Sequence, residues 1–324
     1  MLLEAGVLYS SPLRYPGGKR KLSIYIKRII EENGLCDGKY IEVYAGGAAV
    51  ALDLLLQEYV THIYINDLSK SVYAFWHCVL KETEVLCKLI NDTPVNFDIW
   101  KKQKGIQENP GNYNILDLGF STFFLNRTNR SGIINAGIIG GKNQNGKWKL
   151  DARYMKKDLI KRIELIARYG KRISLYNLDA VEFIRNIFPG LPDKSLIYLD
   201  PPYYIKGKDL YENYYEHTDH KKLSEVVIKR IKKQKWMISY DNISPVYEFY
   251  KGYRYITYQL NYTAQNRYHG SEVIFFCHNL KIPQMTNSKL KIVHYYDQQI
   301  QQVKNDGKIE MTRAVEVGGK KFRI

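Results

Sequence analysis

The sequence predicts one α/β domain of the Rossmann-like type, built around a parallel sheet. Three segments predict this fold class. They are a strand, glycine turn and helix over residues 40–56, a strand over 62–65, and a buried strand over 195–199. Polar or glycine residues follow each strand directly, and open α/β sheets bind their ligands at the carboxyl ends of the strands. The residues after the strand over 195–199 are therefore placed where such sheets bind ligands.

The strand over 195–199 leads into Asp200-Pro201-Pro202-Tyr203. The two prolines fix φ and remove amide donors, so their carbonyl groups stay available as acceptors. The Asp200 carboxylate and the Pro201 carbonyl could each accept one N–H of an exocyclic amine, which would turn the nitrogen lone pair toward an electrophile. Tyr203 offers a ring on which a flat base could stack. The competing interpretation is a proline-rich turn without chemistry.

The segment over 40–56 carries Gly46 and Gly47 between its strand and its helix, and glycines there let a ligand approach the backbone closely. Close packing of the helix on the strand would need the same small residues. The next strand ends at Asp67, about 20 residues beyond the glycines, where a carboxylate can bind ribose hydroxyls. Glu42 is a candidate to face an amino-acid part of the ligand. A nucleoside without phosphate fits this pattern better than a dinucleotide.

A Pro-Gly-Gly-Lys segment over 16–19 precedes a helix with apolar residues from Leu22 to Ile30 and a stop at Gly34. The phosphate-loop pattern is incomplete, because its first glycine and the hydroxyl residue after the lysine are missing. We interpret the segment as a loop whose backbone and Lys19 grip a carboxylate at a helix N-terminus. A surface loop with a solvated lysine is the alternative.

These three segments, in this order, resemble the motifs of the Dam-type (D12 class) DNA adenine N6-methyltransferases. The resemblance covers roughly residues 10–280, and it includes Phe123-Phe124-Leu125-Asn126-Arg127 and the strand over 236–241. It implies an α/β, Rossmann-like S-adenosylmethionine-dependent methyltransferase fold with an inserted DNA-recognition segment. After Arg127 the chain lacks the aromatic residue of the GATC-recognising members, so the recognition sequence stays open.

The resemblance also implies which residues form the site. S-adenosylmethionine is expected at the Pro-Gly-Gly-Lys and glycine-turn segments, and the target adenine at the tetrapeptide. The expected cofactor-binding residues are Tyr15, Gly17, Gly18, Lys19, Glu42, Tyr44, Gly46, Gly47, Asp67 and Asp179. The expected catalytic residues are Asp200, Pro201, Pro202 and Tyr203.

The net charge of +16 indicates a polyanionic partner, since neutralising phosphates supplies most non-specific affinity for nucleic acids. Residues 96–158 contain 11 Lys or Arg against 5 Asp or Glu, in a segment rich in Asn and Gly. Arg and Asn side chains suit base edges, and Lys side chains suit phosphates. The expected contacts to double-stranded DNA are Asn126, Arg127, Asn129, Arg130, Lys142, Lys147 and Arg267. A solvated surface charge is the alternative for each.

We expect four regions along the chain. Residues 1–95 form the cofactor-binding half, 96–158 the target-recognition insertion, 159–280 the catalytic half, and 281–324 a basic extension without assignment.

The composition limits the class of protein. The 45% of apolar residues excludes a disordered chain, and no run approaches the 18 apolar residues of a membrane span. Four scattered cysteines form no zinc pattern, and His217 and His220 are interpreted as surface residues or DNA contacts. We expect a cytoplasmic, nucleoid-associated monomer without a metal, with a cognate restriction nuclease as a possible companion.

The predicted reaction is methyl transfer from S-adenosylmethionine to N6 of an adenine flipped out of double-stranded DNA. Adenine N6 methylation of RNA and cytosine N4 methylation use the same geometry and remain alternatives. A catalytically inactive DNA-binding module is the alternative from another class.

Overall fold

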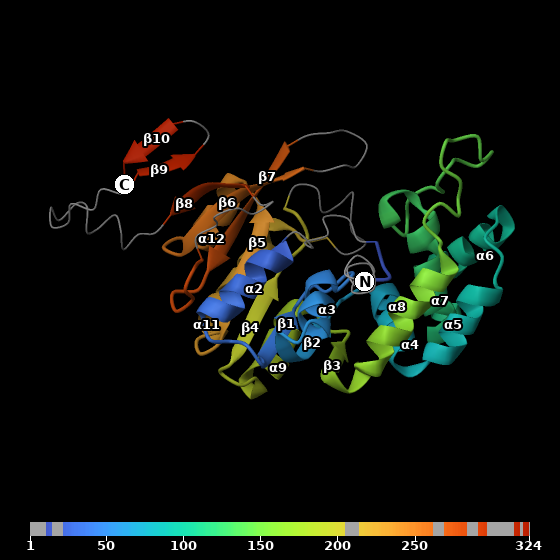
Figure 1. The fold of residues 1–324 in the computed structure, drawn as a ribbon, viewed down its shortest axis with the longest axis horizontal. Helices are drawn as coiled ribbons and strands as arrows, with labels where there is room; N and C mark the ends of the chain where they lie inside the picture. Colours follow the sequence, from blue (N-terminus) through green and yellow to red (C-terminus); the bar gives the residue numbers. More distant parts are fainter. Residues whose placement is uncertain are drawn as a thin grey trace.

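A computed structural model describes residues 11–14, 22–204, 214–261, 269–283, 291–296, 314–317 and 320–323 (Figure 1). Its main feature is an eight-stranded sheet in the order β3-β2-β1-β4-β5-β7-β6-β8. The strands are β1 (Gly38–Glu42), β2 (Val60–Asn66), β3 (Ile173–Tyr176), β4 (Ser195–Leu199), β5 (Lys235–Asp241), β6 (Arg254–Asn261), β7 (His269–Phe276) and β8 (Lys291–Tyr296). A separate hairpin joins β9 (Ala314–Val317) and β10 (Lys320–Arg323).

The first five strands of the sheet run parallel, and the last three add antiparallel pairs. From β1 the chain crosses to β2 on one side, and from β4 it crosses to β5 on the other. Right-handed crossovers in opposite directions place the connecting helices on opposite faces. The strand order therefore reverses between β1 and β4, and this switch point is where such sheets bind ligands.

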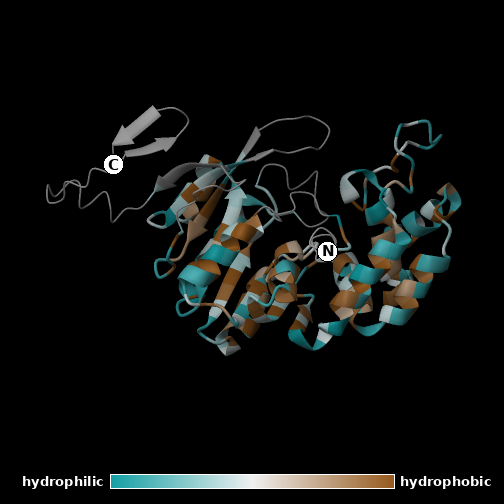
Figure 2. Ribbon diagram, in the orientation of Figure 1, coloured by the Kyte–Doolittle hydropathy of each residue, from teal (hydrophilic) through white to brown (hydrophobic). Residues whose placement is uncertain are grey.

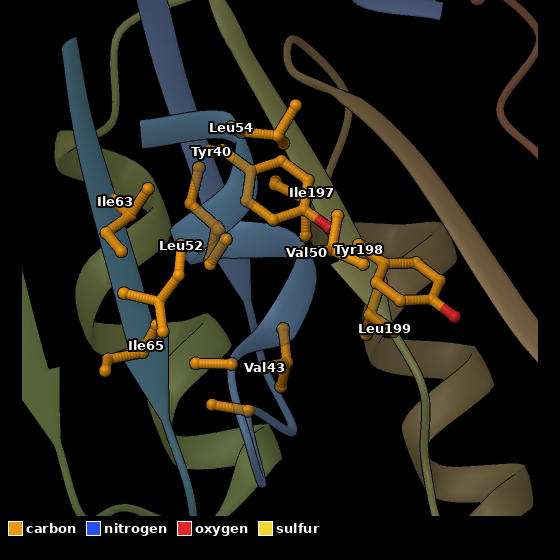
Figure 3. Packing of buried hydrophobic residues seen from close by; sticks show 14 of the residues in the cluster. Tyr40, Val43, Val50, Leu52, Leu54, Ile63, Ile65, Ile197, Tyr198 and Leu199 are labelled. Atoms are coloured by element: carbon orange, nitrogen blue, oxygen red, sulfur yellow. The ribbon is translucent and has the colours of Figure 1, made fainter. Parts of the chain in front are cut away.

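The helices that accompany the sheet are α2 (Ser23–Glu32), α3 (Ala49–Leu56), α9 (Ala180–Ile187), α11 (His217–Arg230) and α12 (Ser244–Phe249). Helix α2 packs on α3, which packs on β1 and β2, while α9 packs on α11. Helix α3 is apolar almost all round, and its side chains interlock with those of β1, β2 and β4 (Figure 3). The core beneath the switch point thus consists of the segments that the sequence pattern singled out.

Five further helices form a lobe beside the β3 edge of the sheet (Figure 1). They are α4 (Lys70–Lys81), α5 (Thr83–Asp92), α6 (Phe97–Glu108), α7 (Ile115–Thr128) and α8 (Lys156–Arg168). Figure 2 shows both apolar and polar residues along these helices, and in α4, α5 and α8 the buried residues are mostly the apolar ones. Helices α4 and α5 follow each other directly, with Glu82 between them.

Helix α7 lies tightly against α4. A Cβ on Gly119 would lie 2.5 Å from Cys78 Sγ and 2.7 Å from the Ala74 carbonyl oxygen, so only glycine permits this approach. The rings of Phe75 and Phe123 stack at 6.0 Å between the two helices. Helix α4, from the expected region 1–95, and helix α7, from the expected region 96–158, therefore share one apolar core.

The strands expected over 195–199 and 236–241 are confirmed as β4 and β5, and β6 and β7 pair beyond them as an antiparallel hairpin. The sequence pattern missed β8, which adds to the edge of the sheet from within the extension. None of the described helices is long and apolar enough to cross a membrane.

Candidate active site and nucleic-acid interface

Four acidic residues end or follow four neighbouring strands of the parallel sheet. Glu42 ends β1, Asp67 follows β2, Asp179 follows β3, and Asp200 follows β4. Because these strands are parallel and adjacent, their carboxyl ends lie at one edge of the sheet. The strand order thus brings together segments that are far apart in the sequence.

The glycine turn is linked to the end of β2 through a carboxylate. The Gly46 amide donates to Asp67 Oδ2 at 2.8 Å, and the Ser69 amide donates to Asp67 Oδ1 at 3.0 Å. Gly46 has a φ of 46° and Ala48 one of 47°, so the turn passes through the left-handed region twice. Trp76 Nε1 donates to the Gly46 carbonyl at 2.9 Å from beneath. The turn and Asp67 thus form one fixed unit.

Glu42 is buried, and its Oε1 accepts the Ala51 amide at 3.0 Å in the first turn of α3. Burial raises the pKa of the Glu42 carboxyl to about 8, and the nearby Asp200 charge adds to the rise, while the bond from the Ala51 amide opposes it. Glu42 therefore supports the start of α3 behind the glycine turn. Tyr44 follows two residues after Glu42, and its hydroxyl lies 3.1 Å from the Tyr215 hydroxyl.

Asp179 caps the N-terminus of α9. Its Oδ1 accepts the amides of Val181 at 2.9 Å and Glu182 at 3.3 Å. Side-chain capping of this kind fixes the carboxylate at the edge beside Asp67.

Asp200 is held by a hydroxyl chain from β4 and β5. The Ser239 hydroxyl donates to Asp200 Oδ1 at 2.5 Å, and the hydroxyl groups of Tyr198 and Ser239 lie 2.8 Å apart. Since Ser239 gives its only proton to Asp200, Tyr198 donates to Ser239. The sequence pattern did not identify Ser239, because its place beside Asp200 depends on the pairing of β4 with β5.

Tyr203 is 8% exposed, and its hydroxyl donates to Glu272 Oε1 at 2.8 Å. The next residue is also tied down, because the Tyr204 amide donates to Asp241 Oδ1 at 3.0 Å. Tyr203 was expected to present its ring for stacking, and here the ring lies mostly inside the protein with the hydroxyl anchored. Glu272 was missed, although a carboxylate before the apolar run Val-Ile-Phe-Phe is a usable signal.

The interpretation of His220 as a surface residue or DNA contact is wrong, because its side chain is 0% exposed. Its ring stacks on Tyr204 at 5.0 Å and contacts the edges of Tyr215 and Tyr240. Burial lowers the pKa of the imidazole to about 4, and neither ring nitrogen has a hydrogen-bond partner among the described residues. His217 is exposed, with Nδ1 2.7 Å from the Tyr204 hydroxyl.

Two expected DNA contacts are corrected. Asn126 donates from Nδ2 to the carbonyls of Arg14 and Gly132, and its Oδ1 accepts the Arg14 amide. Asn129 is 0% exposed, accepts from Trp100 Nε1, and donates to the carbonyls of Ile133 and Ile134. Both amides fasten the turn after α7 and are not presented to a base edge.

Arg127 is also buried, which differs from the exposed position that a base contact requires. Burial lowers the pKa of its guanidinium to about 9, and the charges of Arg162, Arg14 and Arg153 lower it further. Positive charge is therefore concentrated around Arg127, at the end of α7.

Arg130, Lys142 and Lys147 are exposed, as a DNA contact requires. Arg130 lines a pocket of about 460 Å³ together with Arg14, Arg153 and Trp148. Trp148 is 59% exposed, and Lys147 and Arg153 each lie 5.8 Å from its ring centre. No described residue that lines the pocket is acidic, so the pocket suits an anionic, flat ligand such as a nucleotide.

The expected residues Tyr15, Gly17, Gly18, Lys19 and Arg267 lie outside the described residues. The acidic residues at the sheet edge can be compared with the chemical groups of S-adenosylmethionine. Its ribose hydroxyls, its ammonium group and its positively charged sulfur match the carboxylates of Asp67, Asp179 and Asp200, whereas phosphates would be repelled. The residues present fit this cofactor.

Among curated proteins, none matches the chain. Solved structures that match include TrmK of M. capricolum in complex with S-adenosyl-homocysteine, 6% identical, with a TM-score of 0.34 over 78% of this chain and 69% of that chain. They also include the rRNA methyltransferase AviRa of Streptomyces viridochromogenes, 11% identical, with a TM-score of 0.36 over 85% and 91% of the two chains.

The family model described as D12 class N6 adenine-specific DNA methyltransferase matches residues 15–264, which include the glycine turn, Asp67 and the whole Asp-Pro-Pro-Tyr segment. Strand order and carboxylate edge agree with that match. The chain belongs to the D12 class of N6 adenine-specific DNA methyltransferases, enzymes whose cofactor is S-adenosylmethionine.

Proposed function

We propose that this enzyme methylates N6 of an adenine that is flipped out of double-stranded DNA at a specific site. The observation that carries the proposal is the position of Asp200 at the switch point, oriented by Ser239 and followed by two prolines. Adenine N6 is buried in the base stack of a duplex, so the base must leave the stack before it reaches this edge. Flipping costs a few kcal/mol, about what contacts to the displaced base and backbone can supply.

The acceptors at the tetrapeptide determine the chemistry. Asp200 and the Pro201 carbonyl each accept one N–H of the target amine, so the nitrogen lone pair points away from both. S-adenosylmethionine, which Asp67 and Asp179 would hold, would supply an electrophilic methyl group to the amine that Asp200 and Pro201 orient, and its sulfur would leave as the thioether of S-adenosyl-homocysteine. The nitrogen then loses a proton, for which Asp200 is the nearby carboxylate. Positioning and exclusion of water provide the catalysis, without a covalent enzyme intermediate.

Three carboxylates are assigned to the cofactor. Asp67 lies beside the glycine turn for the ribose, Asp179 lies at the end of β3 for the adenine part, and Glu42 lies behind the turn for the amino-acid part. The polar bonds that already hold Asp67 and Asp179 support this assignment, because they fix each carboxylate before the ligand arrives.

We assign DNA recognition to the segment 96–158, and within it to the exposed cations. Arg130, with Arg14 and Arg153 in the same pocket, is the candidate for base edges and adjacent phosphates. Lys142 and Lys147 are candidates for phosphates alone. Trp148 offers a stacking surface with two cations beside it.

The test is the identity of the methylated product. Purified enzyme and S-adenosylmethionine are incubated with duplex DNA, single-stranded DNA and RNA of the same sequences, and the nucleosides are separated by mass spectrometry. We expect N6-methyladenine in duplex DNA at one sequence context. N4-methylcytosine, preferential methylation of RNA, or DNA binding without any product would each replace the proposal with one of its competitors.

A further inference from the structure

A buried carboxylate on β7 lies next to the catalytic tetrapeptide. Glu272 is 1% exposed. Its Oε1 accepts the Tyr203 hydroxyl at 2.8 Å, and its Oε2 accepts the hydroxyl of Tyr258 on β6. Each oxygen of the carboxylate thus has a tyrosine hydroxyl, one from the tetrapeptide and one from the neighbouring strand.

The position of Glu272 is unusual for its strand. The following residues of β7, from Val273 to Phe276, are all apolar and buried. Burying a carboxylate is costly unless hydrogen bonds compensate, and well-packed apolar residues often stabilise such a site at least as well. Stability alone therefore does not explain a carboxylate at this position.

The tetrapeptide needs a constraint that its own sequence does not supply. The prolines fix the backbone before Tyr203, but they leave the direction of its side chain open. In the pairing of β5 with β7, Glu272 lies opposite Asp241. Glu272 binds the Tyr203 side chain, and Asp241 binds the Tyr204 amide. One pair of residues across two strands therefore holds the segment at two successive points.

We propose that Glu272 is a positioning residue that fixes the ring of Tyr203 for contact with the target base. This inference rests on the proposed function, in which a flipped adenine enters the Asp-Pro-Pro-Tyr segment, and it takes Tyr203 as the ring that the adenine contacts there. Because Glu272 holds the hydroxyl, the side chain of Tyr203 keeps one direction before the base arrives, and the base can meet only the small part of the residue that stays exposed. The carboxylate acts through Tyr203 and does not touch the base.

Tyr258 provides a matched control. Its hydroxyl binds the same carboxylate, its side chain is fully buried, and it lies outside the tetrapeptide. Tyr203→Phe and Tyr258→Phe each remove one hydroxyl from Glu272. A purely structural carboxylate would make the two variants equivalent, whereas a positioning role makes only the first one lower the rate of methyl transfer.

The experiment measures single-turnover methyl transfer on duplex DNA, with S-adenosylmethionine affinity and melting temperature as further readouts. We expect Tyr203→Phe to lower the single-turnover rate about tenfold and Tyr258→Phe to stay within about twofold of the wild type. A fluorescent adenine analogue at the target position should show an altered environment in the first variant only. Cofactor affinity should be unchanged in both.

Glu272→Leu and Tyr203→Phe, alone and combined, form a double-mutant cycle that extends the test. In the wild-type background it should lower the transfer rate about as much as Tyr203→Phe does, and in the Tyr203→Phe background it should cause no further loss. Equal rate losses in the two tyrosine variants, or a wild-type rate in Tyr203→Phe, would overturn the positioning role even if Glu272→Leu does not fold. Wild-type enzyme that forms no N6-methyladenine in duplex DNA would instead refute the proposed function.

Discussion

The carboxyl edge of the sheet and the pocket of the recognition segment differ in charge and in burial. At the edge, Asp67, Asp200 and Glu272 each accept hydrogen bonds from neighbouring strands or turns. In the pocket, Arg130 and Trp148 are exposed, and the lining is cationic. The edge is a set of fixed acceptors, and the pocket is a set of accessible donors and one aromatic ring.

This difference agrees with the roles proposed for the two regions. A reacting amine has to be held within a fraction of an ångström, and only groups with their own fixed partners can do this. A long polyanion is attracted over a distance by charge, and exposed Lys and Arg side chains can adapt to its backbone. Substitutions at the edge should therefore affect methyl transfer, and those at the pocket should affect affinity and choice of sequence.

The largest effect is expected for Asp200→Ala. Loss of the carboxylate proposed to hold the amine should lower methyl transfer by about 10³-fold or more, the scale for removing a well-placed polar group in an active site. Affinity for S-adenosylmethionine should be nearly intact. Asp200→Asn should be less harmful, because its amide oxygen can still accept the N–H. Wild-type turnover in Asp200→Ala, measured as methyl groups transferred to duplex DNA, would contradict the assignment.

Asp67→Ala should weaken cofactor binding by about 1.5–3 kcal/mol, the range for a hydrogen bond to a charged group. Two causes combine, because the variant loses the ribose contact and also leaves the Gly46 and Ser69 amides without their acceptor. Asp67→Asn keeps one acceptor oxygen and should retain more affinity. Calorimetric titration with S-adenosylmethionine gives both values, and unchanged affinity in the alanine variant would refute the role of Asp67.

Within the recognition segment, Arg130→Ala and Lys147→Ala separate base reading from charge attraction. Arg130→Ala should relax discrimination at one base pair by about 1–3 kcal/mol. Lys147→Ala should weaken binding to all duplexes alike and reduce its salt dependence. Competition binding on a panel of duplexes measures both. If the two variants lost affinity in the same way for every sequence, the pocket would contribute charge only.

The smallest effect concerns acid stability and His220. Its folded-state pKa of about 4 lies below the ordinary value of 6.5, so the unfolded chain takes up this proton first. The free energy of unfolding is therefore unaffected by protonation of His220 above pH 6.5, and it falls as the pH is lowered from 6.5 toward 4. Between pH 7 and pH 5, protonation of this residue in the unfolded chain should lower the free energy of unfolding by about 1–2 kcal/mol.

His220→Phe preserves the ring contacts with Tyr204 and removes this titration. Denaturant unfolding at pH 7 and pH 5 should show a smaller loss of stability on acidification in the variant than in the wild type. The same loss in both proteins would mean that other groups determine the acid sensitivity.

The sequence by itself determined the elements that depend on neighbours along the chain. A strand, two glycines and an apolar helix lie within residues 40–56, so local spacing was enough to predict β1, the turn and α3. Asp67 and the Asp-Pro-Pro-Tyr segment follow their strands directly, which placed them at the sheet edge before any fold was known. The fold class followed from the same spacing.

The tertiary structure alone decided which groups hold those residues. Ser239 reaches Asp200 and Glu272 reaches Tyr203 only because β5 lies between β4 and β7 in the sheet. Burial of Asn126, Asn129 and His220 depends in the same way on packing between distant segments. Polar residue type indicated surface contacts at these positions, but burial is set by the partners that folding supplies, and these lie up to 112 residues away for Asn126.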